Sequence, residues 1–282
     1  RGHKKLDSKE IEKWLDPRLK LALPSPLKLK DMNKAVKRVT DAIKYNQKIA
    51  ILGDYDVDGA TSSALLYRAF KMFGIKPLIY IPDRLKEGYG PNISALDKLK
   101  ALGAELLITV DCGTTAFEAI DHANKIDLDT IILDHHNPEA KLPNAFAVIN
   151  PNRLDDNSGL GMLAAVGVSF MLAGAVKSQL LKEKIIVNQS SINLVDVLDL
   201  VALGTICDVV PLIGPNRALV KQGLKSMSLM NNLGIKMLFE SREIDDFPSV
   251  YHAGYVLGPR INAGGRVGQS DLGAKLLITE DI

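Results

Sequence analysis

Short apolar runs alternate with amphipathic segments over the first half of the chain. Runs rich in branched aliphatic residues predict β-strands at 48–53, 76–82, 105–111, 129–134 and 145–151. Apolar residues at helical spacing between them predict helices at 59–74, 92–103 and 115–125. Because strand–helix–strand units make neighbouring strands parallel, this pattern predicts a doubly wound α/β fold around a mainly parallel, buried sheet.

From about residue 160 the pattern becomes helical, with helices expected at 161–182, 192–206, 216–231 and 250–258. Residues 159–176 carry no charge and approach the length of a membrane-spanning helix. The stretch is rich in Gly, Ala and Ser, however, and polar residues flank it closely. We therefore predict a buried central helix and no membrane association.

The N-terminal 30 residues are basic and interrupted by prolines, which predicts an arm that packs on the main body. A helix should follow over 32–43, with Asp31 as its N-cap. We expect three parts: the arm and first helix (1–47), an α/β core (48–215), and a helical segment (216–282). The chain starts at Arg1 and stops at Ile282 without an obvious terminus, so we expect a piece of a longer protein.

The composition is that of a globular protein, with 46% hydrophobic and 24% charged residues among 282. A net charge of +2 does not by itself indicate a nucleic-acid-binding protein, although a local basic patch is compatible with it. The two cysteines, Cys112 and Cys207, are too few for a disulfide framework. We expect both to be packing residues, in a cytoplasmic protein.

Acidic residues follow the predicted strands. Strand 48–53 runs into Asp54, Asp56 and Asp58. The other groups are Asp111, the triplet Asp134-His135-His136, and Asp208 directly after the apolar segment VLDLVALGTIC (197–207). A single Asp after a strand is usually a helix cap or a loop residue, and a His pair usually lies on the surface. Several such groups at successive strand ends, where ligands of open α/β sheets bind, favour a metal site.

Carboxylates with few imidazoles suit Mn²⁺ or Mg²⁺ better than structural zinc. Five or more carboxylates around a single ion would leave excess negative charge. We therefore expect two ions that share a carboxylate, as in enzymes of hydrolytic phosphoryl transfer. Neighbouring residues of an extended segment point to opposite sides. We therefore expect one of His135 and His136 to bind metal and the other to face substrate.

Four motifs in order, GDYDVDGATS (53–62), VDCGT (110–114), DHH (134–136) and ALGTICDVVPL (202–212), resemble the DHH phosphoesterase family. The resemblance implies two Mn²⁺ or Mg²⁺ ions. Asp54 and Asp56 would hold one ion, and Asp54 would substitute for a His that relatives carry near Leu52. Asp58, His135 and Asp208 would hold the second ion, and Asp111 would bridge the two ions. His136 would contact the scissile phosphate, and Asp134 would orient a neighbouring His.

Two further segments, IPDRLKEGYGPN (81–92) and LGPRINAGGRVG (257–268), resemble the branch of this family that degrades single-stranded DNA. Candidate phosphate contacts are Arg84, Arg260 and Arg266, the last two on an expected Gly-rich loop. Tyr89 would stack on a base, although a packed Tyr is the simpler alternative.

The resemblance implies a 5′→3′ exonuclease that hydrolyses single-stranded DNA to 5′-mononucleotides in recombination and repair. It implies single-strand-binding protein and a RecQ-type helicase as partners, and a second lobe, the DHHA1 domain, beyond Ile282. Two alternatives stay open. One is a DHH phosphodiesterase acting on oligoribonucleotides or cyclic dinucleotides, and the other is a non-catalytic scaffold.

Overall fold

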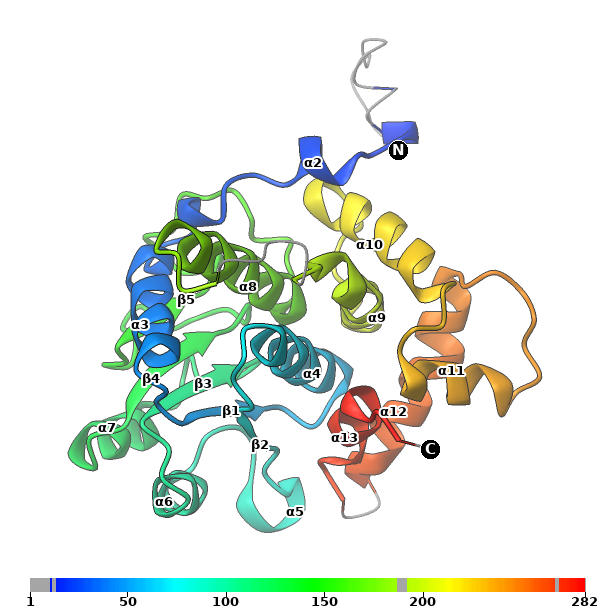
Figure 1. Cartoon of the computed structure of the whole chain (residues 1–282). Helices are drawn as coiled ribbons and strands as arrows, with labels where there is room; N and C mark the ends of the chain where they lie inside the picture. Colours follow the sequence, from blue (N-terminus) through cyan, green and yellow to red (C-terminus); the bar gives the residue numbers. More distant parts are fainter. Residues whose placement is uncertain (1–10, 12–13, 187–191, 267–268, 282) are drawn as a thin grey trace.

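A computed structural model describes residues 11, 14–186, 192–266 and 269–281. Five strands form one parallel sheet in the order β2-β1-β3-β4-β5 (Figure 1). They are β1 Ile49–Gly53, β2 Leu78–Tyr80, β3 Leu106–Val110, β4 Asp129–Leu133 and β5 Ala147–Ile149. Each lies inside a predicted strand, so the α/β expectation is confirmed, with helices on both faces of the sheet.

The helices among the described residues are α2 Leu19–Ala22, α3 Met32–Lys44, α4 Val57–Met72, α5 Arg84–Glu87, α6 Ile93–Ala101, α7 Phe117–Lys125, α8 Ala165–Lys182, α9 Leu198–Cys207, α10 Gly214–Met227, α11 Leu233–Glu240, α12 Gly258–Arg266 and α13 Leu272–Ile278. Two short 3₁₀ segments, η1 Pro26–Lys28 and η3 Leu194–Val197, and one π-helical segment, η4 His252–Leu257, join them. The sequence pattern did not predict α11 or α13.

Alternate residues of each strand face opposite sides of the sheet, and both sides are buried. In β1, Ile49 and Ile51 belong to the large core beneath α3, α4 and α8. Ala50 and Leu52 instead face the smaller core under α6 and α7. This two-sided burial explains why β1 and β3 are continuous apolar runs rather than alternating ones.

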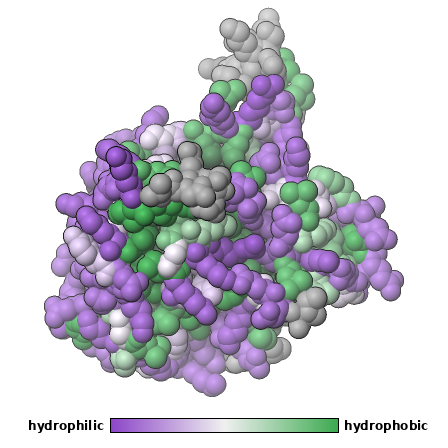
Figure 2. All heavy atoms as spheres, in the orientation of Figure 1, coloured by the Kyte–Doolittle hydropathy of each residue, from purple (hydrophilic) through white to green (hydrophobic). Residues whose placement is uncertain are grey.

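The uncharged stretch forms the buried helix that we expected. Helix α8 begins at Ala165 and packs against α3, α4 and α9. No helix among the described residues is long and apolar enough to cross a membrane. Hydrophilic side chains cover much of the face in Figure 2.

Asp31 is at the N-cap position of α3, as predicted, but its side chain does not cap the helix. Its backbone is left-handed (φ 61°) and its side chain makes no capping hydrogen bond. Its Oδ2 instead accepts from the backbone N–H of Val148 at 3.2 Å and from Arg153 Nη1 at 2.8 Å. The carboxylate therefore ties the start of α3 to β5.

The glycine-rich segment GPRINAGGR is helix α12, not the loop that its glycines suggested. These glycines permit close packing, because a Cβ on Gly264 would lie 2.9 Å from Leu272 Cβ and one on Gly265 would lie 2.8 Å from the Tyr55 ring. Helix α12 thus lies against α13 and the segment before α4. This packing brings α12 against Tyr55, close to the carboxyl end of β1. The division of the chain into three parts stays a prediction.

Candidate metal centre

The acidic residues gather where the sheet reverses its strand order. The chain runs from β1 to β2 at one edge and then returns to β3 on the other side of β1. The carboxyl ends of β1 and β3 lie next to each other at this switch point, where open α/β sheets bind ligands. Asp54 directly follows β1, and Asp111 directly follows β3.

Backbone amides offset the charge of two aspartates after β1. Asp56 is the N-cap of α4, and its Oδ1 accepts from the N–H of Gly59 at 3.0 Å. Asp58 is buried in the first turn, and its carboxylate accepts from the N–H groups of Ala165 at 2.7 Å and Val166 at 2.9 Å, at the start of α8. Two helix N-termini, which favour negative charge, therefore meet at this cluster.

Gly59 is required by close packing. A Cβ on this residue would lie 2.3 Å from the carbonyl oxygen of Asp54. No other residue fits without moving the backbone that carries Asp54.

Asp111 has an unusual backbone. Its φ is +60°, a left-handed conformation that Asp tolerates better than most residues. Its N–H donates to the carbonyl of Leu133 at 2.9 Å, and its own carbonyl accepts from the Tyr89 hydroxyl at 3.1 Å. The residue is 1% exposed, so the carboxylate points into the protein.

The Asp134 carboxylate organises the residues after β4. Its Oδ1 accepts from the N–H groups of His135 (2.8 Å) and His136 (3.1 Å) and lies 2.7 Å from His136 Nδ1, and its Oδ2 accepts from the N–H of Thr114 at 3.1 Å. Burial alone would raise the pKa of Asp134, but the bonds from His136 and Thr114 lower it to about 2. Its carboxylate in turn raises the pKa of His136 to about 9, so His136 is a cation at neutral pH.

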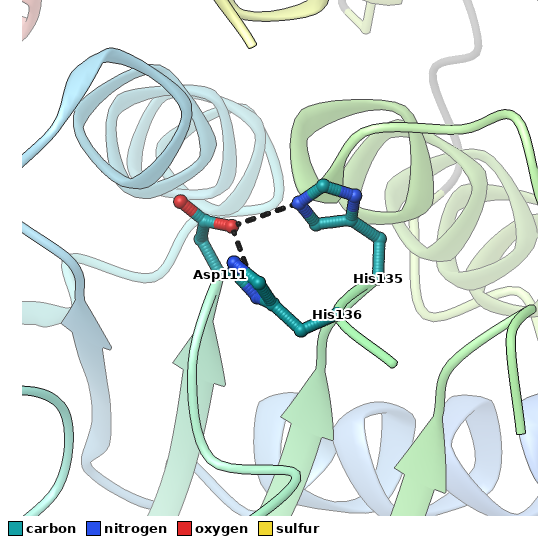
Figure 3. A group of neighbouring side chains, drawn as sticks. All are labelled: Asp111, His135 and His136. Carbon is teal, nitrogen blue, oxygen red and sulfur yellow. Dashed lines mark ion pairs between the residues drawn. The ribbon is translucent and has the colours of Figure 1, made fainter. Parts of the chain in front are cut away.

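Both imidazoles approach the same aspartate, which contradicts the expectation that they face opposite ways (Figure 3). His135 Nε2 lies 3.3 Å and His136 Nδ1 lies 3.9 Å from Asp111 Oδ1, and the ring centroids are 4.7 Å apart. Strand β4 ends at Leu133, so the alternation of a strand does not apply to the turn that follows it.

Two asparagines hold the backbone of the histidines, and the sequence reasoning missed them. Asn150 Nδ2 donates to the carbonyl of His136 at 2.8 Å and to Thr114 Oγ1 at 3.2 Å. Asn152 Nδ2 donates to the carbonyl of His135. Asn150 follows β5 directly, so the rule that pointed to the aspartates after β1 and β3 would also have found it.

All the predicted metal ligands come together in three groups whose ligand atoms lie within 4.8 Å of one another. The groups are Asp54, Asp56 and Asp111; Asp58, His135 and Asp208; and Asp111, His135 and His136. Asp111 belongs to the first and the third group and His135 to the second and the third. Asp111 is therefore placed where one carboxylate could serve two ions. Within the described residues, neither cysteine belongs to such a group.

Unpartnered atoms at the centre of these groups fit a cation. Asp111 Oδ1, His135 Nε2 and Asp208 Oδ2 are buried and have no hydrogen-bond partner among the described residues. His135 Nε2 lies 3.3 Å from Asp111 Oδ1 and 3.5 Å from Asp208 Oδ2. Buried polar atoms almost always have a partner, and carboxylate oxygens with one imidazole suit a hard divalent cation.

The pKa shifts of the ligand residues also fit a cation site. Burial raises the pKa of Asp58, and the Asp208 and Asp56 carboxylates raise it further. Burial also raises the pKa of Asp111, followed by Asp58 and Asp56. The pKa of Asp208 rises to about 6 through burial and the Asp56 charge. Burial and His136 lower the pKa of His135, which keeps it neutral, the form that binds metal.

The predicted substrate-binding residues have different surroundings. Arg266 lines a cavity of about 420 Å³ that also contacts Val57 and Cys207, the neighbours of predicted ligands. Arg260 lines a different cavity of about 530 Å³, and its Nη1 donates to the carbonyl of Val256 at 2.6 Å. The Arg84 side chain lies outside the described part of the structure. Tyr89, which has its hydroxyl on Asp111, is 52% exposed.

The profile of the DHH family, N-terminal domain, matches residues 48–205, which contain every strand and most of the cluster. The chain belongs to the DHH family. Among curated proteins, this DHH chain is 38% identical to the single-stranded-DNA-specific exonuclease RecJ of Bacillus subtilis over 91% of its length. It is also 38% identical to RecJ of Escherichia coli over 90% of its length. These alignments span 31% and 45% of the two relatives.

Solved structures give the same picture. A manganese-bound exonuclease RecJ superposes with a TM-score of 0.78 at 31% identity, over 92% of the DHH chain and 63% of that structure. RecJ of Thermus thermophilus with Mn²⁺ superposes with a TM-score of 0.76 at 29% identity, over 95% of the chain and 37% of that structure. The chain thus spans about a third to two thirds of the length of these relatives.

Proposed function

We propose that this chain carries the catalytic centre of a metal-dependent 5′→3′ exonuclease, which hydrolyses single-stranded DNA to 5′-mononucleotides in recombination and repair. One observation supports this most strongly. Two carboxylate-rich groups meet near Asp111 in a chain 38% identical to RecJ exonucleases along about nine tenths of its length.

In this proposal, the centre would hold two divalent cations, Mn²⁺ or Mg²⁺. Asp54 and Asp56 would hold one, and Asp58, His135 and Asp208 would hold the other. Asp111 would be the carboxylate that the two cations share. When bound, such a pair of cations lowers the pKa of a water molecule and neutralises charge that develops on phosphoryl oxygens. The unpartnered oxygens of Asp111 and Asp208 are the atoms best placed to bind these cations.

His136 is the proposed contact to the scissile phosphate. Its Nδ1 faces Asp134, which fixes the ring and leaves Nε2–H to donate to a phosphoryl oxygen. The imidazolium form, favoured by a pKa of about 9, suits this anionic partner. The imidazole is 51% exposed, so a substrate can reach it.

Arg266 is the further DNA contact that position supports, because it lines the cavity beside the ligands and would bind a phosphate of the DNA. Arg84 and Arg260 are proposed as phosphate contacts from the sequence motifs alone. The half-exposed Tyr89 ring would stack on a base. Single-strand-binding protein and a RecQ-type helicase are the proposed partners, in the cytoplasm.

A polarity assay tests the proposal. The purified protein is incubated with single strands labelled at the 5′ or the 3′ end, together with Mn²⁺. We expect a labelled mononucleotide to be released at once from the 5′-labelled strand, and the activity to be lost in Asp111→Asn. Attack from the 3′ end would refute the polarity. Faster turnover of dinucleotides than of long strands would favour the oligoribonucleotide or cyclic-dinucleotide alternative, and no hydrolysis of any of these substrates would favour a scaffold.

A further inference from the structure

The two ends of the Tyr89 side chain have different surroundings. The hydroxyl donates to the main-chain carbonyl of Asp111 at 3.1 Å, whereas the residue as a whole is 52% exposed. One side chain therefore joins the protein surface to the backbone of the residue shared between the ligand groups. Base stacking would use the ring but does not require this hydrogen bond.

The segment that carries Tyr89 is fixed on both sides. Before it, the Glu87 carboxylate accepts from the N–H of Asp83 at 3.1 Å and pairs with Lys98. After it, Gly90 (φ +71°) packs close to the side chain of Cys112. These contacts hold the Tyr89 hydroxyl against the Asp111 peptide.

The Asp111 peptide needs such support. A non-glycine residue at φ +60° is uncommon, although Asp tolerates it, so contacts around the peptide help to fix its orientation. Strand pairing holds the Asp111 N–H on Leu133, and Thr109 Oγ1 donates to the carbonyl of Cys112 at 3.0 Å in the turn that follows. The Tyr89 hydroxyl supplies a partner for the carbonyl between these two points. With the N–H fixed, a rotation about the N–Cα bond of Asp111 would move its carbonyl and its Cβ together. Such a rotation would carry Oδ1 away from His135 Nε2, which lies 3.3 Å away.

We propose that Tyr89 is a positioning residue for the metal centre: its hydroxyl fixes the Asp111 peptide and so aims the shared carboxylate at both ligand groups. The inference rests on the proposed two-cation centre. The ring of the same residue is exposed. A DNA base that stacks on this ring would therefore also affect the position of the hydroxyl that orients Asp111. Metal binding and DNA binding are then coupled through this one side chain, and the coupling is reciprocal.

Tyr89→Phe tests the inference because it keeps the ring and removes only the hydroxyl. Mn²⁺ binding is measured by isothermal titration calorimetry without nucleic acid, and the melting temperature of the metal-free protein is recorded alongside. We expect the affinity for Mn²⁺ to fall about 10-fold, at the lower end of the roughly 10- to 100-fold loss typical when the partner behind a metal ligand is removed. The metal-free melting temperature should change little, and the electron paramagnetic resonance spectrum of bound Mn²⁺ should differ from that of the wild type.

Tyr80→Phe is the matched control. It removes a tyrosine hydroxyl at the end of β2, nine residues before Tyr89. That hydroxyl contacts Glu87, which keeps its bonds to Lys98 and to the Asp83 N–H. We expect wild-type Mn²⁺ affinity in this variant. Unchanged affinity in Tyr89→Phe, or an equal loss in both variants, would overturn the positioning role. A wild-type protein that binds no Mn²⁺ would instead overturn the proposed centre itself.

Discussion

Asp208 offers the sharpest test of how the metal-free centre affects stability. This residue ends α9, where the helix dipole disfavours a negative charge, and its Oδ2 has no hydrogen-bond partner among the described residues. Its side chain is only 20% exposed. A cation would compensate this charge, and without one the charge opposes folding.

The magnitude follows from the pKa. A rise from 3.8 to about 6 corresponds to a destabilisation of roughly 3 kcal/mol when the carboxylate is charged. Asp208→Asn removes the charge and nearly keeps the shape. We expect it to raise the free energy of unfolding of the metal-free protein by about 1–3 kcal/mol at pH 7.5, or several degrees in melting temperature.

The pH dependence has a defined sign. Between pH 3.8 and about 6 the folded protein keeps a proton on Asp208 that the unfolded chain has lost. The stability contributed by this group therefore falls as the pH rises through that window. The difference between Asp208→Asn and wild type should be small at pH 4 and complete above pH 6.

With Mn²⁺ bound, the wild type should become more stable than Asp208→Asn. Saturation at about 100 times the dissociation constant stabilises a protein by roughly 2.7 kcal/mol, and Asp208→Asn should gain much less than the wild type. The assay is denaturant unfolding at pH 4 and pH 7.5, with EDTA or with Mn²⁺. A metal-free variant less stable than the wild type at pH 7.5, or one that gains as much from Mn²⁺, would refute the reasoning.

Two further variants test the surroundings of the centre. Asp134→Asn should lower the pKa of His136 from about 9 toward its ordinary value near 6.5, because the carboxylate beside Nδ1 is the main cause of the raised pKa. NMR titration of the metal-free imidazole measures this pKa, and an unchanged value would contradict the prediction. Asn150→Ala should destabilise the fold by about 1–3 kcal/mol, since it removes the partner of the His136 carbonyl and of Thr114 Oγ1; an unfolding free energy within 0.5 kcal/mol of wild type, a margin typical of surface changes, would contradict it.

Much of the sheet could be predicted from the sequence because buried parallel strands are continuous apolar runs between turn residues. The same pattern located the site, because carboxyl ends of parallel strands share one edge. Asp111 and Asp134 could be found in this way without knowing which strands are neighbours.

Other features could not be predicted because they depend on tertiary packing. Asp31 has the residue type of an N-cap, but contacts with Val148 and Arg153 hold it in another role. Glycines near the C-terminus suggested a loop, yet packing against Tyr55 and Leu272 makes the segment helical. The relative orientation of the two histidines depends on the turn after β4, for which strand alternation gives no information.

Counting bound metal tests the central claim most directly. Equilibrium dialysis of the purified protein against Mn²⁺, with metal analysis of the dialysed sample, gives the number of ions per chain. The ligand groups that meet near Asp111 predict two ions in the wild type, and fewer than two in Asp111→Asn, a substitution that the left-handed backbone tolerates. A wild-type chain that binds one ion or none, or an Asp111→Asn chain that binds two with unchanged affinity, would contradict the account.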